Sequence, residues 1–181
     1  NSVDVTVKTV EVEFKSGFSK VLFNICSALS GRYGCDKSLK LLEMHLTEKS
    51  YYELSGLNPD VVVSTGSSLA GVNFIFSDVN LSRSLVAMRP GILGFDKFDL
   101  VVTQRHDLAP KKNNVVVIDG ALNLVDADSL KADAQRLCVL KGLDGNKSYI
   151  GVLIGGDTKG FSIPGSIVEG LIEKIKILSS K

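Results

Sequence analysis

The stretch Asp60–Gly66, with the sequence DVVVSTG, decides the fold class. Three consecutive valines stand between an Asn-Pro pair on one side and a Thr-Gly pair on the other. A short β-branched run bounded by turn residues is typical of a strand buried on both faces, as strands of parallel sheets are. We therefore expect an α/β protein with a Rossmann-like parallel sheet, in which residues 60–64 form one strand.

Similar apolar runs along the chain predict further strands, with helices between some of them. The connections Met88–Asp99 and Thr103–Asn114 are instead expected to be loops rich in Pro and Gly. The other expected strands are Ser84–Met88, Asp99–Thr103, Asn114–Asp119 and Tyr149–Ile154, and a β-rich stretch opens the chain at residues 3–14. Helical spacing of apolar residues predicts helices at Phe18–Leu29, Ser38–Glu48, Leu69–Phe76 and Asp126–Leu140, the last capped by Asp126 or Asp128. Five strand runs after the opening stretch favour a sheet covered by helices on both faces.

The composition indicates a folded protein without a strong preference for polyanions. Hydrophobic residues make up 44% of the chain, charged residues 23%, and the net charge is +1. This balance provides no overall field that would attract nucleic acid or an anionic membrane surface. Three cysteines without a CxxC pair and only two histidines favour a reducing, cytoplasmic location and no structural metal. No apolar run approaches the length of a membrane-spanning helix, although peripheral membrane contact stays open.

The chain is expected to contain one domain and the beginning of another. A turn at residues 143–148 separates the two parts, and we place the boundary near residue 146. Residues 1–146 would form a Rossmann-like domain, and residues 147–181 the opening βα unit of a second one. The start on a strand-like alternation, without a leading Met, indicates that a first βα unit is missing.

Two polar segments directly follow predicted strands, where an open parallel sheet binds its ligands. In the first, Thr65, Gly66 and Ser67 open a helix, so that free backbone N–H groups and hydroxyls offer an anion site or, alternatively, an ordinary helix cap. In the second, Thr103–Asp107, the consecutive Arg105, His106 and Asp107 supply a cation, a proton carrier and a carboxylate. Consecutive loop residues point in different directions, so these three need not form one cluster, and His106 could be a hydrogen-bonded loop residue only.

Two glycine-containing turns follow later strands. Asp119–Asn123 is interpreted as a tight strand exit. Gly155, Gly156, Thr158 and Lys159 follow the predicted strand at residues 149–154, and a glycine pair beside a hydroxyl and an ammonium group suits a phosphate or a sugar. The chain lacks the Walker pattern, the dinucleotide glycine fingerprint, the G-x-S-x-G elbow and HExxH. The sequence therefore does not support the chemistries that those motifs carry.

Four motifs in order resemble the mitochondrial fission ELM family over roughly residues 58–161. They are Asp60–Gly66, Asp99–Asp107, Asn114 with Gly120–Asn123, and Val152–Lys159. The bacterial-type members of this family are labelled predicted nucleoside-diphosphate-sugar epimerases. Because this chain lacks the dinucleotide fingerprint, we discount the epimerase label as a description of its chemistry. In two places the chain departs from the family: it begins after the usual first strand and turn, and Ser67 and Ser68 stand where arginines are expected.

The resemblance implies a two-domain GT-B-like architecture and a glycosyltransferase that takes a nucleotide-sugar donor and an unidentified acceptor. His106 or Asp107 would then be the general base, with Arg105 beside them, while Lys159 and the Gly155 and Gly156 amides would stabilise the donor phosphate. No metal and no other cofactor is implied. The alternative is a non-enzymatic adaptor, since plant members of the family are tied to recruiting a dynamin-related protein to mitochondria.

Overall fold

The computed structural model describes residues 4–31, 35–120, 122–123, 125–144, 146–147, 149–157 and 160–179. The chain divides into two compact units, Asn1–Asn123 and Leu124–Lys181, which are described separately below. This division lies before the helix at residues 127–141, and the domain boundary expected near residue 146 stays a prediction.

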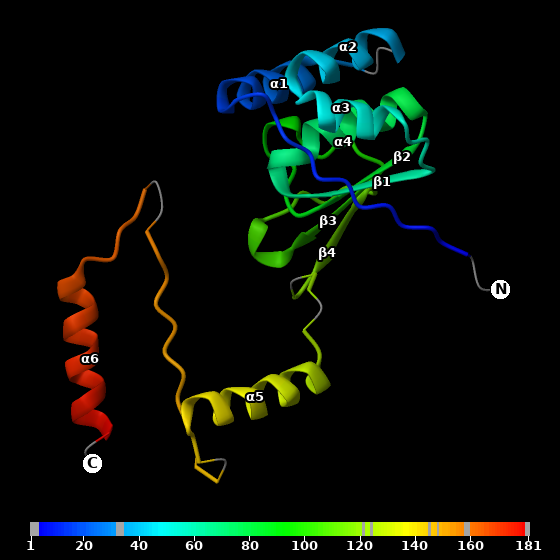
Figure 1. Ribbon diagram of the computed structural model, residues 1–181. Helices are drawn as coiled ribbons and strands as arrows, with labels where there is room; N and C mark the ends of the chain where they lie inside the picture. The colour runs from blue at the N-terminus through cyan, green and yellow to red at the C-terminus, as the bar shows by residue number, and fades with distance from the viewer. Residues whose placement is uncertain are drawn as a thin grey trace. The chain divides into compact units, whose positions relative to one another are not determined.

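The first unit is an α/β fold with one parallel sheet of four strands (Figure 1). Its strands are β1 (Val61–Thr65), β2 (Arg83–Ala87), β3 (Leu100–Gln104) and β4 (Val115–Ile118), and they lie side by side in chain order. Its α-helices are α1 (Gly17–Leu29), α2 (Cys35–His45), α3 (Glu48–Ser55) and α4 (Gly66–Asn80). This arrangement confirms the predicted parallel, Rossmann-like α/β fold.

Between Val61 and Ile118, a range that the structure describes throughout, only α4 is a full helix between strands. β2 leads to β3 through the short 3₁₀ helix η1 (Gly91–Leu93), and β3 leads to β4 through η2 (Arg105–Asp107). The sequence predicted loops in both places, and the structure confirms them. The α-helices of the first unit are layered on the face of the sheet that α4 covers, and Val61 and Val63 on the opposite face are 49% and 63% exposed. The prediction of helices on both faces is thus not met inside this unit.

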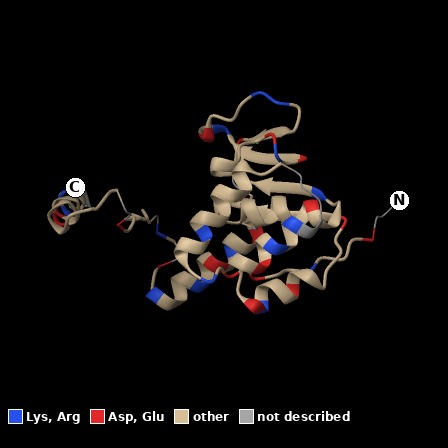
Figure 2. Cartoon of the chain, turned by 90° about the horizontal axis from the view of Figure 1, so that it is seen from above, with Lys and Arg blue, Asp and Glu red and all other residues tan. Residues whose placement is uncertain are grey.

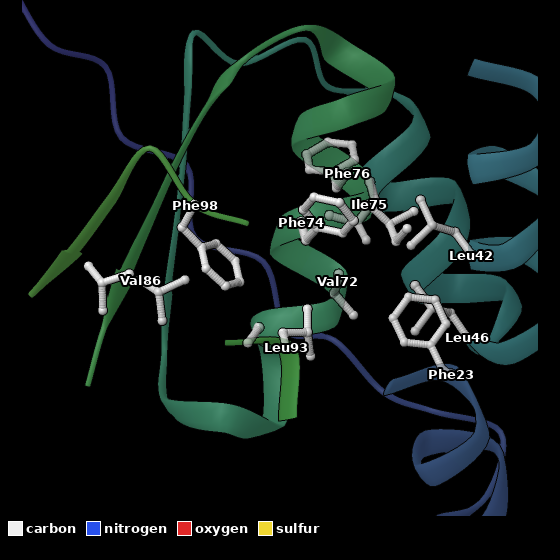
Figure 3. Packing of buried hydrophobic residues seen from close by; sticks show 13 residues of the cluster. Phe23, Leu42, Leu46, Val72, Phe74, Ile75, Phe76, Val86, Leu93 and Phe98 are labelled. Atoms are coloured by element: carbon white, nitrogen blue, oxygen red, sulfur yellow. The ribbon is translucent and has the colours of Figure 1, made fainter. Parts of the chain in front are cut away.

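The core lies around α4, between the sheet and the outer helices (Figure 3). Nine consecutive residues of α4, from Ala70 to Asp78, are buried, because the helix contacts β1 and β2 on one side and α1 and α2 on the other. Figure 3 shows Phe74 of α4 beside Phe98, with Phe23 and Leu42 on the side of the outer helices. A helix with apolar residues all round, as α4 has, must be buried in this way.

Asn73 is the polar residue at the centre of α4. Its Nδ2 donates to the backbone oxygens of Val62 and Leu85, at 3.2 and 2.8 Å, and to the Ser64 hydroxyl at 3.0 Å. These acceptors belong to β1 and β2, so one side chain links the helix to two neighbouring strands. A buried amide without such partners would destabilise the fold.

A second polar cluster joins the amino ends of β2 and β3. The Ser84 amide and hydroxyl both donate to Oδ2 of Asp99 at 2.9 Å, and Nη1 of Arg83 donates to Oδ1 at 2.7 Å. Burial raises the pKa of Asp99, but the hydrogen bonds from Ser84 and the charge and hydrogen bond of Arg83 outweigh it and lower this pKa to about 2. The carboxylate is therefore ionised at ordinary pH.

The β-rich structure predicted for the opening stretch, residues 3–14, is wrong for the residues that the structure describes. Among the described residues 4–14, only Phe14 forms a β-bridge, an antiparallel one with Leu46. The segment is bonded to the helical layer instead, since the Thr47 amide donates to the Glu13 oxygen and the Glu13 amide donates to Ser50. Alternation alone predicted a strand here, but Val5 and Val7 are 70% and 81% exposed, and none of the described strands lies beside them.

The helix expected at Ser38–Glu48 is also corrected, because two helices cover this region. α2 ends at His45, and Thr47 caps α3 by accepting a hydrogen bond from the Ser50 amide. The side-chain oxygen of Thr47 favours a new helix start, which the helical spacing of Leu39, Leu42 and Leu46 did not indicate.

The second unit contains α5 (Ala127–Lys141) and α6 (Gly165–Ser179). Of the two caps predicted for α5, Asp126 and Asp128, the structure has Asp126, in a capping box with Ser129. The strand expected at Tyr149–Ile154 is wrong: these residues pair with no strand in the described chain, and Ile150 and Leu153 are 93% and 96% exposed. A parallel strand needs a neighbour to accept its backbone hydrogen bonds, and the described part of this unit offers none.

Replacing Asn73 by Leu should lower the free energy of unfolding by about 2 kcal/mol, because β1 and β2 lose a shared donor while the helix keeps a side chain of similar volume. Urea unfolding followed by circular dichroism measures this loss. Asn80→Ala is the control on the same helix, since Asn80 donates to Phe76 of its own helix, and it should cost less than about 1 kcal/mol. Equal losses in the two variants would show that Asn73 does not link the helix to the sheet.

Candidate functional site

The carboxyl ends of the four strands lie at one edge of the sheet, because all four are parallel. The chain leaves this edge through the residues that follow Thr65, Ala87, Gln104 and Ile118. Both polar segments that the sequence singled out in the first unit, Thr65–Ser67 and Arg105–Asp107, therefore start at the same edge.

The exit of β1 opens directly into α4. Thr65 is the N-cap residue of α4, but its side chain makes no capping hydrogen bond, and Gly66 has a φ of +72°. Thr65 and Ser67 are exposed. Nζ of Lys20, from α1, donates to the Ser68 hydroxyl at 3.0 Å. The start of α4 thus combines exposed hydroxyls and a nearby ammonium group with the positive end of a helix dipole, which is a favourable environment for an anion.

The exit of β3 holds a histidine beside a fixed carboxylate. The Thr103 hydroxyl donates to Oδ2 of Asp107 at 3.1 Å, while Oδ1 of Asp107 lies 3.8 Å from Nε2 of His106. The side chains of His106 and Asp107 are 79% and 26% exposed. At 3.8 Å the carboxylate and the ring are too far apart for a hydrogen bond, but Asp107 can stabilise a positive charge that the exposed ring of His106 gains when it takes up a proton.

Arg105 does not join this pair. Its Nε lies 2.5 Å from Oδ1 of Asp119, at the exit of β4, and both side chains are largely exposed. The three consecutive residues thus divide into a His106–Asp107 pair and an Arg105–Asp119 ion pair, which agrees with the expectation that they need not form one cluster.

The loop after β2, Met88–Gly91, connects these two regions, and the sequence analysis did not single out its residues. Nη1 of Arg89 donates to the backbone oxygen of Asp107 at 3.4 Å. Gly91, with φ +67°, lies so close to Ser67 that a Cβ built on it would be 2.7 Å from the Ser67 Cβ. Met88 has a φ of +71°, which is uncommon for a residue with a side chain. The Pro- and Gly-rich composition marked this segment as a loop, but only the folded chain shows that it contacts both sites.

Gln104, the last residue of β3, has a buried side-chain oxygen. Its Oε1 finds no hydrogen-bond partner among the described residues, and the residue is 9% exposed. An unpaired buried acceptor costs roughly 1–3 kcal/mol. Gln104 belongs to the polar segment Thr103–Asp107 that the sequence predicts, but no role was predicted for it. Nothing in the sequence distinguishes an amide with hydrogen-bond partners from one without them.

The predicted glycine turn belongs to the second unit. Gly155 and Gly156 lie in an exposed segment without regular structure, and nothing would lie within 4 Å of a Cβ on either glycine. Thr158 and Lys159 lie outside the described residues. The ligand-binding role predicted for these four residues stays a prediction.

A comparison with models of protein families identifies the family of this chain. A model described as Mitochondrial fission ELM1 matches residues 8–181. The chain belongs to the mitochondrial fission ELM1 family. No curated protein and no solved structure gives a match to it.

In this ELM1-family chain, the described residues were compared with the requirements of a metal site and of a membrane-spanning helix. Among them, no group of three or more His, Cys, Asp or Glu side chains is placed to hold a metal ion. Within the same residues, no helix combines the length and the apolar character needed to cross a membrane. Over the first unit, Lys and Arg are interspersed with Asp and Glu (Figure 2). What the sheet edge does present is a histidine–carboxylate pair, two guanidinium groups and the hydroxyl-rich start of α4.

Replacing Gly91 by Ala should destabilise the protein more than replacing Gly66 by Ala. Both glycines have positive φ, where a Cβ costs about 1–2 kcal/mol. Only at Gly91 would the new Cβ also meet Ser67, since nothing lies within 4 Å at Gly66. We expect an additional loss of about 1 kcal/mol or more for Gly91→Ala in urea unfolding. Equal losses would show that the loop after β2 does not pack against the start of α4.

Proposed function

We propose that this chain carries a GT-B-like glycosyltransferase domain that uses a nucleotide-sugar donor. The observation that carries the proposal is the His106–Asp107 pair, fixed by Thr103 at the carboxyl edge of a parallel sheet. Ligands of open α/β sheets bind at this edge. The family resemblance supplies the substrate class, and the geometry supplies a candidate base.

In the proposed reaction an acceptor hydroxyl loses its proton to His106, and its oxygen attacks the anomeric carbon of the donor sugar. The bond between that carbon and the diphosphate oxygen breaks, and the nucleoside diphosphate leaves with the bonding electron pair. Asp107, whose Oδ1 lies 3.8 Å from Nε2 of His106, stabilises the positive charge of the ring after proton transfer. Thr103 keeps Asp107 in place, so Thr103 is a positioning residue.

Stabilisation of the leaving diphosphate needs hydrogen-bond donors and positive charge. The start of α4 with Ser67, and the guanidinium of Arg89, can provide them at the sheet edge of the first unit. In the second unit the resemblance assigns this task to Lys159 and to the amides of Gly155 and Gly156. The reaction as proposed includes no metal ion.

A thermal-shift screen of the full chain against UDP-, GDP-, ADP- and dTDP-linked sugars tests the proposal. A ligand at about 100 times its Kd adds roughly 2.7 kcal/mol of stability to the native state, so a binding donor should raise Tm measurably. With that donor, His106→Ala should lower turnover by about 10²- to 10⁴-fold and leave the shift in Tm unchanged. Lys111→Ala, an exposed lysine in the connection between β3 and β4, is the control and should retain turnover.

Absence of any shift in Tm across the panel would reject the nucleotide-sugar proposal. A donor that binds but turns over equally well with His106→Ala would reject His106 as the base.

A second function, that of a non-enzymatic adaptor, is favoured by the exposed face of α1. Its large exposed residues are all apolar and recur at helical spacing: Phe18, Val21, Leu22, Ile25 and Leu29. The opposite face, with Phe23 and Ser27, is buried in the helical layer. A contiguous apolar surface of this kind marks an interaction site more often than it marks a monomer surface.

The adaptor hypothesis and the glycosyltransferase hypothesis are distinguished by a serine variant of α1 and by His106→Ala. Val21 and Ile25 are about half exposed, so replacing both by Ser should leave the fold intact and remove binding to a protein partner, while nucleotide-sugar binding persists. A partner identified by photocrosslinking through position 22 of the full chain provides the measurement. If this partner is lost with His106→Ala and retained with the serine variant, the adaptor hypothesis for α1 is wrong.

A further inference from the structure

Three buried side-chain amide oxygens have no hydrogen-bond partner among the described residues, and they belong to Asn24, Asn73 and Gln104. Asn73 donates to the sheet through its Nδ2, and Asn24 lies in α1 near Gly71. Asn24 belongs to α1, and Asn73 belongs to the buried middle of α4, so neither stands at the end of a strand. Gln104 is different, because it ends β3 at the carboxyl edge of the sheet.

The strand register shows what shares this edge with Gln104. It pairs with Ile118 of β4, and two residues earlier Val102 pairs with Ala87 of β2. Because side chains alternate along a strand, Gln104 lies on the same face as Val102, opposite to Thr103, which holds Asp107. Arg105 and His106 follow immediately, and Arg89 reaches the backbone of Asp107 from the loop after β2.

An unpaired amide oxygen in this position favours one kind of ligand group. A carbonyl oxygen accepts hydrogen bonds and repels phosphate oxygens, so it suits a hydroxyl and not an anion. The guanidinium groups of Arg89 and Arg105 have the opposite preference. An edge that holds both kinds of group suits a molecule that is anionic at one end and rich in hydroxyls at the other.

We propose that Oε1 of Gln104 accepts a hydrogen bond from a sugar hydroxyl of the ligand bound at this edge, which makes Gln104 a specificity-determining residue. The inference rests on the nucleotide-sugar function proposed above and adds the atom that selects the hydroxyl. Since the oxygen is covered in the free protein, binding must replace the protein atoms that cover it with the hydroxyl. A site built to bond a hydroxyl discriminates strongly against an analogue that lacks it.

The test combines stability and binding in Gln104→Met, which keeps the side-chain length and removes the acceptor. In the free full chain this variant should be at least as stable as the wild type, because the oxygen it removes has no partner. Its Kd for the UDP- or GDP-sugar found in the thermal-shift panel should rise about tenfold. Asn24→Ala removes an equally unpaired oxygen away from the edge and should leave Kd unchanged.

Deoxyfluoro analogues of the same nucleotide sugar identify the hydroxyl. For the wild type, the Kd of one analogue should be about tenfold higher than the Kd of the parent nucleotide sugar. For Gln104→Met, the same analogue and the parent should have equal Kd values. Equal Kd values for the wild type and Gln104→Met would overturn the inference and leave the proposed function standing, as would a clear loss of stability in free Gln104→Met. Failure of the wild type to bind any nucleotide sugar would overturn the proposed function, and the role of Gln104 with it.

Discussion

The burial of α4 on all its sides is the constraint on which the rest of the first unit depends. The helix lies between the sheet and the pair α1 and α2, so its sequence is apolar around most of its circumference. Such a helix has no exposed face that fixes its rotation. The Asn73 amide provides this information, because its hydrogen bonds to β1 and β2 can form in only one orientation of the helix. One polar residue thereby sets the register of helix against sheet.

The direct connection from β1 places the start of α4 at the carboxyl edge of the sheet. α4 begins at Gly66, immediately after β1, so its first turn lies where the strands end. The loop after β2 then packs on Ser67 through Gly91 and reaches η2 through Arg89. The chemistry proposed for His106 therefore depends on contacts that extend from a buried helix, through a strained loop, to a short 3₁₀ helix.

On the outer side of the helical layer, α1 keeps an exposed apolar face. α1 uses Phe23 and Ser27 to pack in the layer, and Phe23 meets Phe14 and His45 edge to face at 5.6 and 5.7 Å. The remaining apolar residues of α1 cannot reach the core, because one helix can bury only one stripe in a single neighbouring layer. An apolar face thus persists on this surface for a structural reason, and a partner can use it without any change to the strands of the sheet. The candidate site at the sheet edge and the apolar face of α1 therefore occupy separate surfaces of the first unit.

The sequence by itself determined the parallel sheet, the four strands β1 to β4 and the polar residues at their ends. Short β-branched runs between turn residues have few alternatives, and the residue after each run must lie at the strand end. Local capping chemistry likewise limited the cap of α5 to Asp126 or Asp128, and the structure shows that it is Asp126. The local pattern was insufficient in two places: alternation at residues 4–14 and an apolar run at residues 149–154 both predicted strands. A strand exists only where another strand accepts its hydrogen bonds.

The tertiary structure alone decided which polar groups meet. Arg105, His106 and Asp107 are consecutive, yet the backbone of η2 directs Arg105 to Asp119 and leaves His106 beside Asp107. Arg89 and Gly91 acquire their importance only from contacts with residues distant in the chain. The unpaired oxygen of Gln104 is the clearest example. Whether a buried oxygen has a hydrogen-bond partner depends on its neighbours in space, and the sequence does not show which residues these are.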